Sequence, residues 1–86
     1  MKTLSVMVQN KHGNTTAELQ LSFLYGVDLI SSTIASLTLT QADFTDRDLI
    51  ELSTWLDETI VKLEDGDLID VNYTIGNNKV RLYVKY

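Results

Sequence analysis

The sequence predicts an α+β fold in which an antiparallel sheet of about five strands, in the order ββ(β)αββ, carries one long helix on one face. Two pairs of segments alternate apolar and polar residues, a helical apolar stripe lies between the pairs, and a polar turn joins the members of each pair. The chain has 86 residues, of which 44% are hydrophobic, so residues 1–86 have the size of a single globular domain. It contains no cysteine, so packing alone must hold the fold together.

The first pair of strands spans residues 3–9 and 17–23, in which apolar side chains recur at every second position. The polar stretch 10–14 between them contains Gly13, which can adopt the positive φ of a tight turn. These recurring apolar side chains fall on one face when Val8 stands opposite Ala17, Val6 opposite Leu19 and Leu4 opposite Leu21.

The second pair spans residues 69–75 and 80–86, and Gly76-Asn77-Asn78-Lys79 joins them. A two-residue turn at Asn77 and Asn78 is expected, because asparagine tolerates the left-handed conformation better than most residues. This turn predicts four cross-strand pairs: Ile75 with Val80, Tyr73 with Leu82, Val71 with Val84, and Asp70 with Lys85.

Between the pairs, a helix is predicted from about Asp46 to about Glu64, with Thr45 as its capping residue and Gly66 as its stop. One narrow stripe of this helix is apolar and is expected to lie on the sheet: Leu49, Leu52, Leu56, Ile60 and Leu63. Residues on its flanks, Ile50 and Val61 on one side and Trp55 on the other, are expected to be buried by a broad sheet. Two pairs of opposite charge are spaced for contact on the outer face: Arg47 with Glu51, and Glu58 with Lys62.

Residues 26–40 fit two structures. Val27, Ile30, Ile34 and Leu37 have the spacing of a helical face, whereas the alternation over residues 37–40, amid serine and threonine, fits a strand. We expect a strand from about Thr33 to Leu39, because β-branched residues and serine dominate there.

Charge is distributed unevenly. Residues 43–70 contain ten acids against Arg47 and Lys62, a net charge of −8, whereas the rest of the chain carries five cations against two acids, a net charge of +3. Such a dipolar molecule would repel phosphate and attract a basic protein surface through its acidic segment. The alternative is that these acids form an ordinary solvated helix face.

No residue pattern indicates catalysis, a cofactor or a metal. His12 lies in a predicted turn without a nucleophile motif beside it, and the four glycines are isolated, so no phosphate-binding loop exists. Residues 64–70 are rich in acids but lack the regular spacing and the late glutamate of a calcium loop. We therefore expect no enzyme activity, no cofactor and no metal.

Lys79, Arg81, Tyr83 and Lys85 place cations and an aromatic ring on one strand face, where nucleic-acid bases can stack. These few cations on an acidic domain argue against direct nucleic-acid binding. Cross-strand pairing and protection of a sheet edge explain the same residues.

The function expected is therefore that of a small acidic protein-binding module, such as a phage or mobile-element inhibitor that covers a basic surface of a restriction or CRISPR effector. The alternative is a structural or assembly subunit.

A small core and uncovered strand edges also indicate a homodimer, with a strand edge or the Trp55 flank at its interface. Without a signal peptide or a run of about 18 apolar residues, a cytoplasmic protein without a membrane segment is expected. The residues assigned to partner binding are Asp57, Glu64, Asp65, Asp67, Trp55, Arg81, Tyr83 and Lys85.

Overall fold

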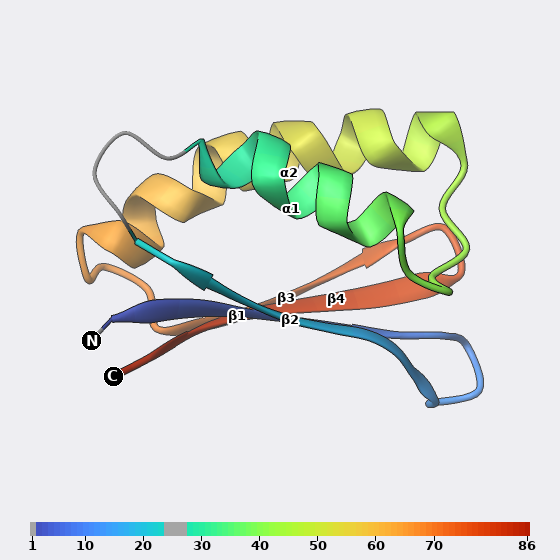
Figure 1. Ribbon diagram of the computed structural model, residues 1–86, viewed down its shortest axis with the longest axis horizontal. Helices are drawn as coiled ribbons and strands as arrows, with labels where there is room; N and C mark the ends of the chain where they lie inside the picture. Colours follow the sequence, from blue (N-terminus) through green and yellow to red (C-terminus); the bar gives the residue numbers. More distant parts are fainter. Residues whose placement is uncertain (1, 24–27) are drawn as a thin grey trace.

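The computed structural model describes residues 2–23 and 28–86, which form two layers: an antiparallel sheet and two helices that cover one of its faces (Figure 1). The elements follow in the order β1 (Thr3–Gln9), β2 (Thr15–Ser22), α1 (Leu29–Thr38), α2 (Asp46–Glu64), β3 (Asp70–Ile75) and β4 (Asn78–Lys85). The predicted α+β fold is confirmed, but the described residues form a sheet of four strands, not about five, and two helices, not one.

The strands lie in the order β2-β1-β4-β3, so the first and last strands of the chain are neighbours at the centre of the sheet. Both termini therefore lie at the same end of the molecule (Figure 1). The most deeply buried side chains come from these central strands and from α2, among them Val6, Leu82 and Leu56, each 0% exposed. The helices cover only one side, so the opposite face of the sheet is open.

The strand expected from Thr33 to Leu39 is wrong, because residues 33–38 belong to α1 and Leu39 is its C-terminal cap. The carboxylate of Asp28 caps the helix by accepting hydrogen bonds from the backbone N–H groups of Ile30 (3.0 Å) and Ser31 (3.1 Å). Leu29, Thr33 and Leu37 lie four residues apart and form its buried face. The apparent alternation at residues 37–40 is not a sheet pattern, since Leu39 is 89% exposed. Val27, the first member of the helical pattern, lies outside the described residues.

The limits predicted for the long helix are confirmed, since α2 runs from Asp46 to Glu64. Thr45 and Asp48 form a reciprocal capping box: each side chain accepts a hydrogen bond from the other residue's backbone N–H, both at 3.1 Å. Beyond the helix, Gly66 has a φ of +84°. Of the predicted stripe, Leu52, Leu56, Ile60 and Leu63 are buried and Leu49 is half-buried.

Two expectations for the outer side of α2 are wrong. Ile50 and Val61 remain 69% and 57% exposed, because helical spacing places both well away from the buried stripe of the helix. Within the described part of the chain, neither Arg47 with Glu51 nor Glu58 with Lys62 forms an ion pair. Such exposed pairs contribute little free energy, and Glu51 instead accepts a hydrogen bond from the Tyr73 hydroxyl.

The register predicted for the first hairpin is confirmed at all three pairs. In its turn, the side-chain oxygen of Asn10 accepts hydrogen bonds from the backbone N–H groups of His12 (2.9 Å) and Asn14 (3.0 Å), and Gly13 has a φ of +81°. The alternating pattern and the local turn chemistry therefore lead to one register.

The register predicted for the second hairpin is wrong by two residues. Tyr73 stands opposite Val80, Val71 opposite Leu82 and Ile75 opposite Asn78, which places the turn at Gly76 and Asn77. A shift of two keeps every side chain on its expected face, so the alternating pattern does not distinguish the two registers. Gly76 takes the positive φ of the turn (+58°), which is easier for glycine than for asparagine.

Contacts with a distant loop also favour the observed register. Asn78, expected in the turn, is 2% exposed, and its side-chain amide donates a hydrogen bond to the backbone oxygen of Asp43 at 2.7 Å. The predicted pair of Asp70 and Lys85 does not form, because Asp70 stands opposite Tyr83 and forms an ion pair with Arg81.

Candidate interaction surfaces

The two layers of the fold carry opposite net charge. Residues 28–67, which comprise α1, α2 and their loops and are called the helical layer below, contain ten acids against two cations, a net charge of −8. The remaining residues carry five cations against two acids, a net charge of +3. Most of the negative charge therefore belongs to the helical layer.

The four acids assigned to partner binding are all exposed and all belong to the helical layer: Asp57, Glu64, Asp65 and Asp67. Asp57 and Glu64 are seven residues apart and so share one side of α2. The other two follow Glu64 at the C-terminal end of the helix, where the helix dipole disfavours anions. Helix stability therefore does not account for the acids at this end.

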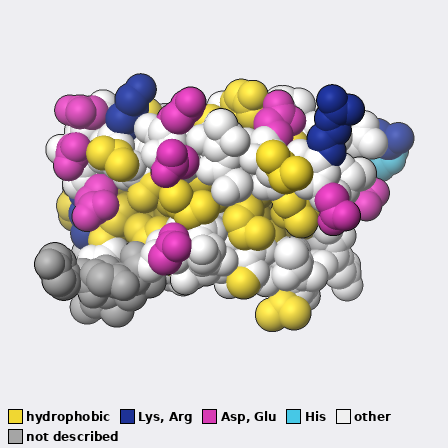
Figure 2. Space-filling view, turned by 90° about the horizontal axis from the view of Figure 1, so that it is seen from above, with side chains coloured by type: hydrophobic (Ala, Val, Ile, Leu, Met, Phe, Trp, Pro, Cys, Tyr) yellow, Lys and Arg dark blue, Asp and Glu magenta, His cyan; other side chains and the backbone are white. Residues whose placement is uncertain are grey.

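Between α1 and α2 lies an apolar groove with a cavity volume of about 430 Å³. We call it the interhelical groove, and its lining residues are Ile30, Ser31, Ile34, Ala35, Leu49, Ile50 and Ser53. Figure 2 shows it as a band of hydrophobic side chains along the helical layer, with acidic side chains around it. The sequence did not predict this groove, because a strand was expected in place of α1; the only signal was the excess of apolar residues on the Ile50 flank of α2.

Trp55 lies apart from this groove, on the side of α2 that faces β3. Its ring stacks on that of Tyr73 with centroids 5.1 Å apart and an angle of 18° between the planes. The Tyr73 hydroxyl donates a hydrogen bond to Glu51 Oε1 at 3.3 Å. The negative charge of Glu51 raises the pKa of Tyr73, and partial desolvation and this hydrogen bond act in the same direction.

Tyr73 is therefore expected to ionise above the ordinary tyrosine pKa of 10.0. Because the pKa of Tyr73 is higher in the folded than in the unfolded state, the neutral tyrosine stabilises the folded protein fully below pH 10.0. This stabilisation is lost as the pH rises through the pKa of Tyr73 in the folded state. Trp55 fluorescence, recorded during an alkaline titration, reports this ionisation because the two rings are stacked. Glu51→Gln should move the transition to lower pH, whereas Glu64→Gln should leave it unchanged. The same transition pH in the unmodified protein and both variants would contradict the assignment of the raised pKa to the charge of Glu51.

Arg81, Tyr83 and Lys85 lie on the open face of the sheet, opposite the helical layer. The guanidinium of Arg81 donates hydrogen bonds to both carboxylate oxygens of Asp70, at 3.0 Å and 2.6 Å, and this holds the pKa of Asp70 below its usual value. The same guanidinium lies over the Tyr83 ring, 4.4 Å from its centroid. Two of the three residues are thus engaged with neighbours on the sheet.

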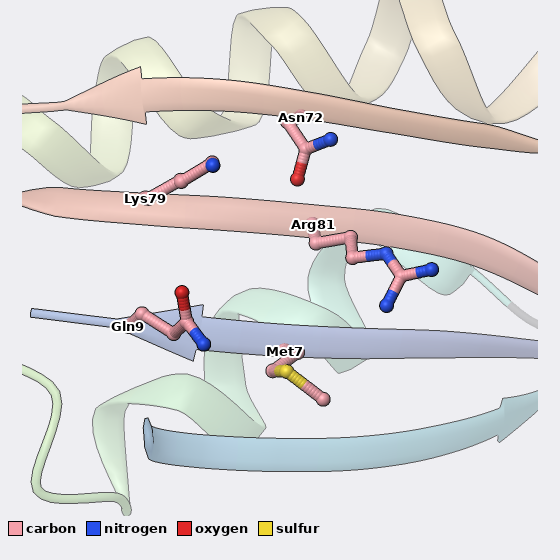
Figure 3. A pocket seen from close by; sticks show the side chains of 5 residues that line it. All are labelled: Met7, Gln9, Asn72, Lys79 and Arg81. Carbon is pink, nitrogen blue, oxygen red and sulfur yellow. The ribbon is translucent and has the colours of Figure 1, made fainter. Parts of the chain in front are cut away.

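The open face also holds a shallow depression of about 180 Å³ (Figure 3). Met7 and Gln9 from β1, Lys79 and Arg81 from β4, and Asn72 from β3 line it. The outward side chains of the sheet include three cations, Lys79, Arg81 and Lys85, against the carboxylates of Glu18 and Asp70, a net charge of +1. This charge is too small to attract a phosphate backbone strongly.

The structure therefore separates the predicted site residues into three places: the acids on the helical layer, Trp55 against β3, and the cationic strand residues on the open face.

Over residues 2–23 and 28–86, no three histidine or acidic side chains are grouped so that they could hold a metal ion. Neither described helix has both the length and the apolar character of a membrane span. Comparison with known proteins finds no matching family model, no matching curated protein and no matching solved structure.

Proposed function

We propose that this protein is a non-enzymatic binding module that engages a basic surface of another protein through its helical layer. The observation that supports this most directly is the net charge of −8 on the helical layer, against +3 on the rest of the chain. A field of this kind orients the molecule and accelerates its encounter with a positively charged partner.

The class of partner follows from the same charge. Grooves that hold DNA or RNA are strongly basic, and an acidic protein that covers one would prevent the nucleic acid from entering. We therefore propose an inhibitor of a nucleic-acid-handling complex, such as a phage or mobile-element protein directed against a restriction or CRISPR effector. Direct binding of nucleic acid is disfavoured, because the helical layer repels phosphate and the open sheet face carries a net charge of only +1.

The test is affinity capture from lysate of the cells that encode the protein, followed by binding kinetics with the captured partner. A variant with Asp57→Asn, Glu64→Gln, Asp65→Asn and Asp67→Asn should associate about tenfold more slowly at low salt and show a weaker dependence on salt. The control variant, with Glu18→Gln, Lys79→Gln and Lys85→Gln on the open sheet face, should bind like the unmodified protein. If the acidic variant binds unchanged and the control variant loses binding, the proposal fails and the open sheet face is the binding surface.

An assembly subunit is the alternative function, and the sheet supplies an observation in its favour. The edge strands β2 and β3 are available for pairing with a second copy, because α1 and α2 cover a face of the sheet and not its edges. Light scattering over a range of concentrations distinguishes the two functions: an assembly subunit forms dimers or larger oligomers by itself, whereas a monomer at high concentration contradicts that role.

A further inference from the structure

We infer that the interhelical groove is the docking site for a basic amphipathic helix of the partner protein. This inference rests on the proposed function and makes it more specific, because it names the place on the helical layer and the form of the segment that binds there.

The walls of the groove are apolar and remain open to solvent. Ile30 and Ile34 line it from α1, and Leu49 and Ile50 line it from α2. Ile50 lines this apolar groove and is 69% exposed, so burying it would release water from a large aliphatic side chain. An apolar groove between two helices is the form of site that takes the apolar stripe of a third helix.

Acidic residues flank this apolar surface along α2. Helical spacing places Asp46, Ile50, Ser53 and Asp57 in one stripe of the helix, and both acids are exposed. The two acids therefore flank the α2 residues that line the groove, since Leu49, Ile50 and Ser53 lie between Asp46 and Asp57 along the helix. A partner segment with lysine or arginine beside its apolar residues matches this order of charge and apolar surface.

The spacing of these acids also suits a short helix. Asp46 and Asp57 are 11 residues apart, about 16 Å along α2, and the α2 residues that line the groove lie between them. A helix of about three turns spans this distance, with apolar residues at positions i, i+4 and i+7 and cations near both ends.

A second copy of this chain is disfavoured as the occupant. Its two helices belong to a layer of net charge −8, so docking either of them in the groove would bring two strongly acidic layers together. The occupant is therefore a different protein, of opposite charge.

Synthetic peptides test the docking site directly, whatever the identity of the partner. The first probe is a 14-residue peptide of leucine and lysine in which the leucines fall on one helical face, and the second has the same composition in an order that scatters the leucines. Isothermal titration calorimetry should show that the first peptide binds about tenfold more tightly than the second, because only the first can place its leucines together in the groove.

Variants of the protein then locate the binding site. Ile50→Gln should weaken binding of the first peptide about tenfold. The matched control is Ile69→Gln, since Ile69 has the same side chain and a similar exposure, 65% against 69%, but precedes β3 outside the helical layer. The control should leave the affinity unchanged.

The outcomes separate this inference from the proposed function. Equal affinity for the two peptides, or equal loss in the two variants, would overturn the groove as a docking site and leave charge attraction by the helical layer intact. Absence of binding by either peptide would also overturn the docking site, and the capture experiment with the acidic variant would still decide the proposed function.

Discussion

Replacing Leu56 with alanine should lower the free energy of unfolding by about 2 to 5 kcal/mol. Leu56 is 0% exposed and lies at the centre of the buried side of α2, between Leu52 and Leu63, which are also fully buried. Removing its branched end takes apolar surface out of the core and leaves a cavity that the sheet below cannot fill completely.

Urea unfolding followed by circular dichroism measures this loss. Asp57→Ala is the control, because the neighbouring residue is exposed and its replacement should change the free energy of unfolding by less than about 0.5 kcal/mol. A loss below about 1 kcal/mol for Leu56→Ala would mean that α2 does not pack on the sheet through this residue.

Replacing Gly76 with alanine should cost about 2 to 3 kcal/mol of stability, from two separate causes. Gly76 has a φ of +58°, which disfavours any residue with a Cβ atom. An added Cβ would also lie 2.9 Å from Oδ2 and 3.1 Å from Oδ1 of Asp48, the carboxylate that completes the capping box of α2. The substitution therefore strains the turn and disturbs the start of the helix.

Gly66→Ala separates the two causes. Gly66 also has a positive φ, of +84°, but a Cβ there would meet no described atom within 4 Å, so only the backbone strain applies. Gly76→Ala should therefore be more destabilising by about 1 kcal/mol, the typical contribution of a helix cap. This difference should disappear when both glycine variants are made in a protein that carries Asp48→Ala. A difference that persists without the Asp48 carboxylate would contradict the coupling between the turn and the cap.

The features that can be predicted from the sequence alone are those whose signals are local. The limits of α2 follow from Thr45 and Asp48 at its start and from a buried stripe that repeats every three or four residues. The register of the first hairpin follows from apolar side chains at every second position and from a turn that Asn10 and Gly13 stabilise locally. The unequal distribution of acids and cations can also be counted directly from the chain.

Features that depend on contacts between distant residues could not be predicted from local patterns. Both registers of the second hairpin keep the same side chains on the same face, and the observed one buries Asn78 against Asp43, 35 residues away. Residues 33–38 have strand-forming composition, yet packing of Leu37 and its helical neighbours on the core favours α1.

The candidate interaction surfaces also include one part that the sequence predicted and one part that it did not. Its acids were identified from charge alone, whereas the interhelical groove required α1 to lie beside α2. The open-face residues Arg81 and Tyr83 are separated from the acids because β4 pairs with β1 at the centre of a sheet that the helices cover on one side. Local spacing specifies which residues share a face of one element, but the relative positions of the faces depend on long-range packing that a single sequence pattern does not encode.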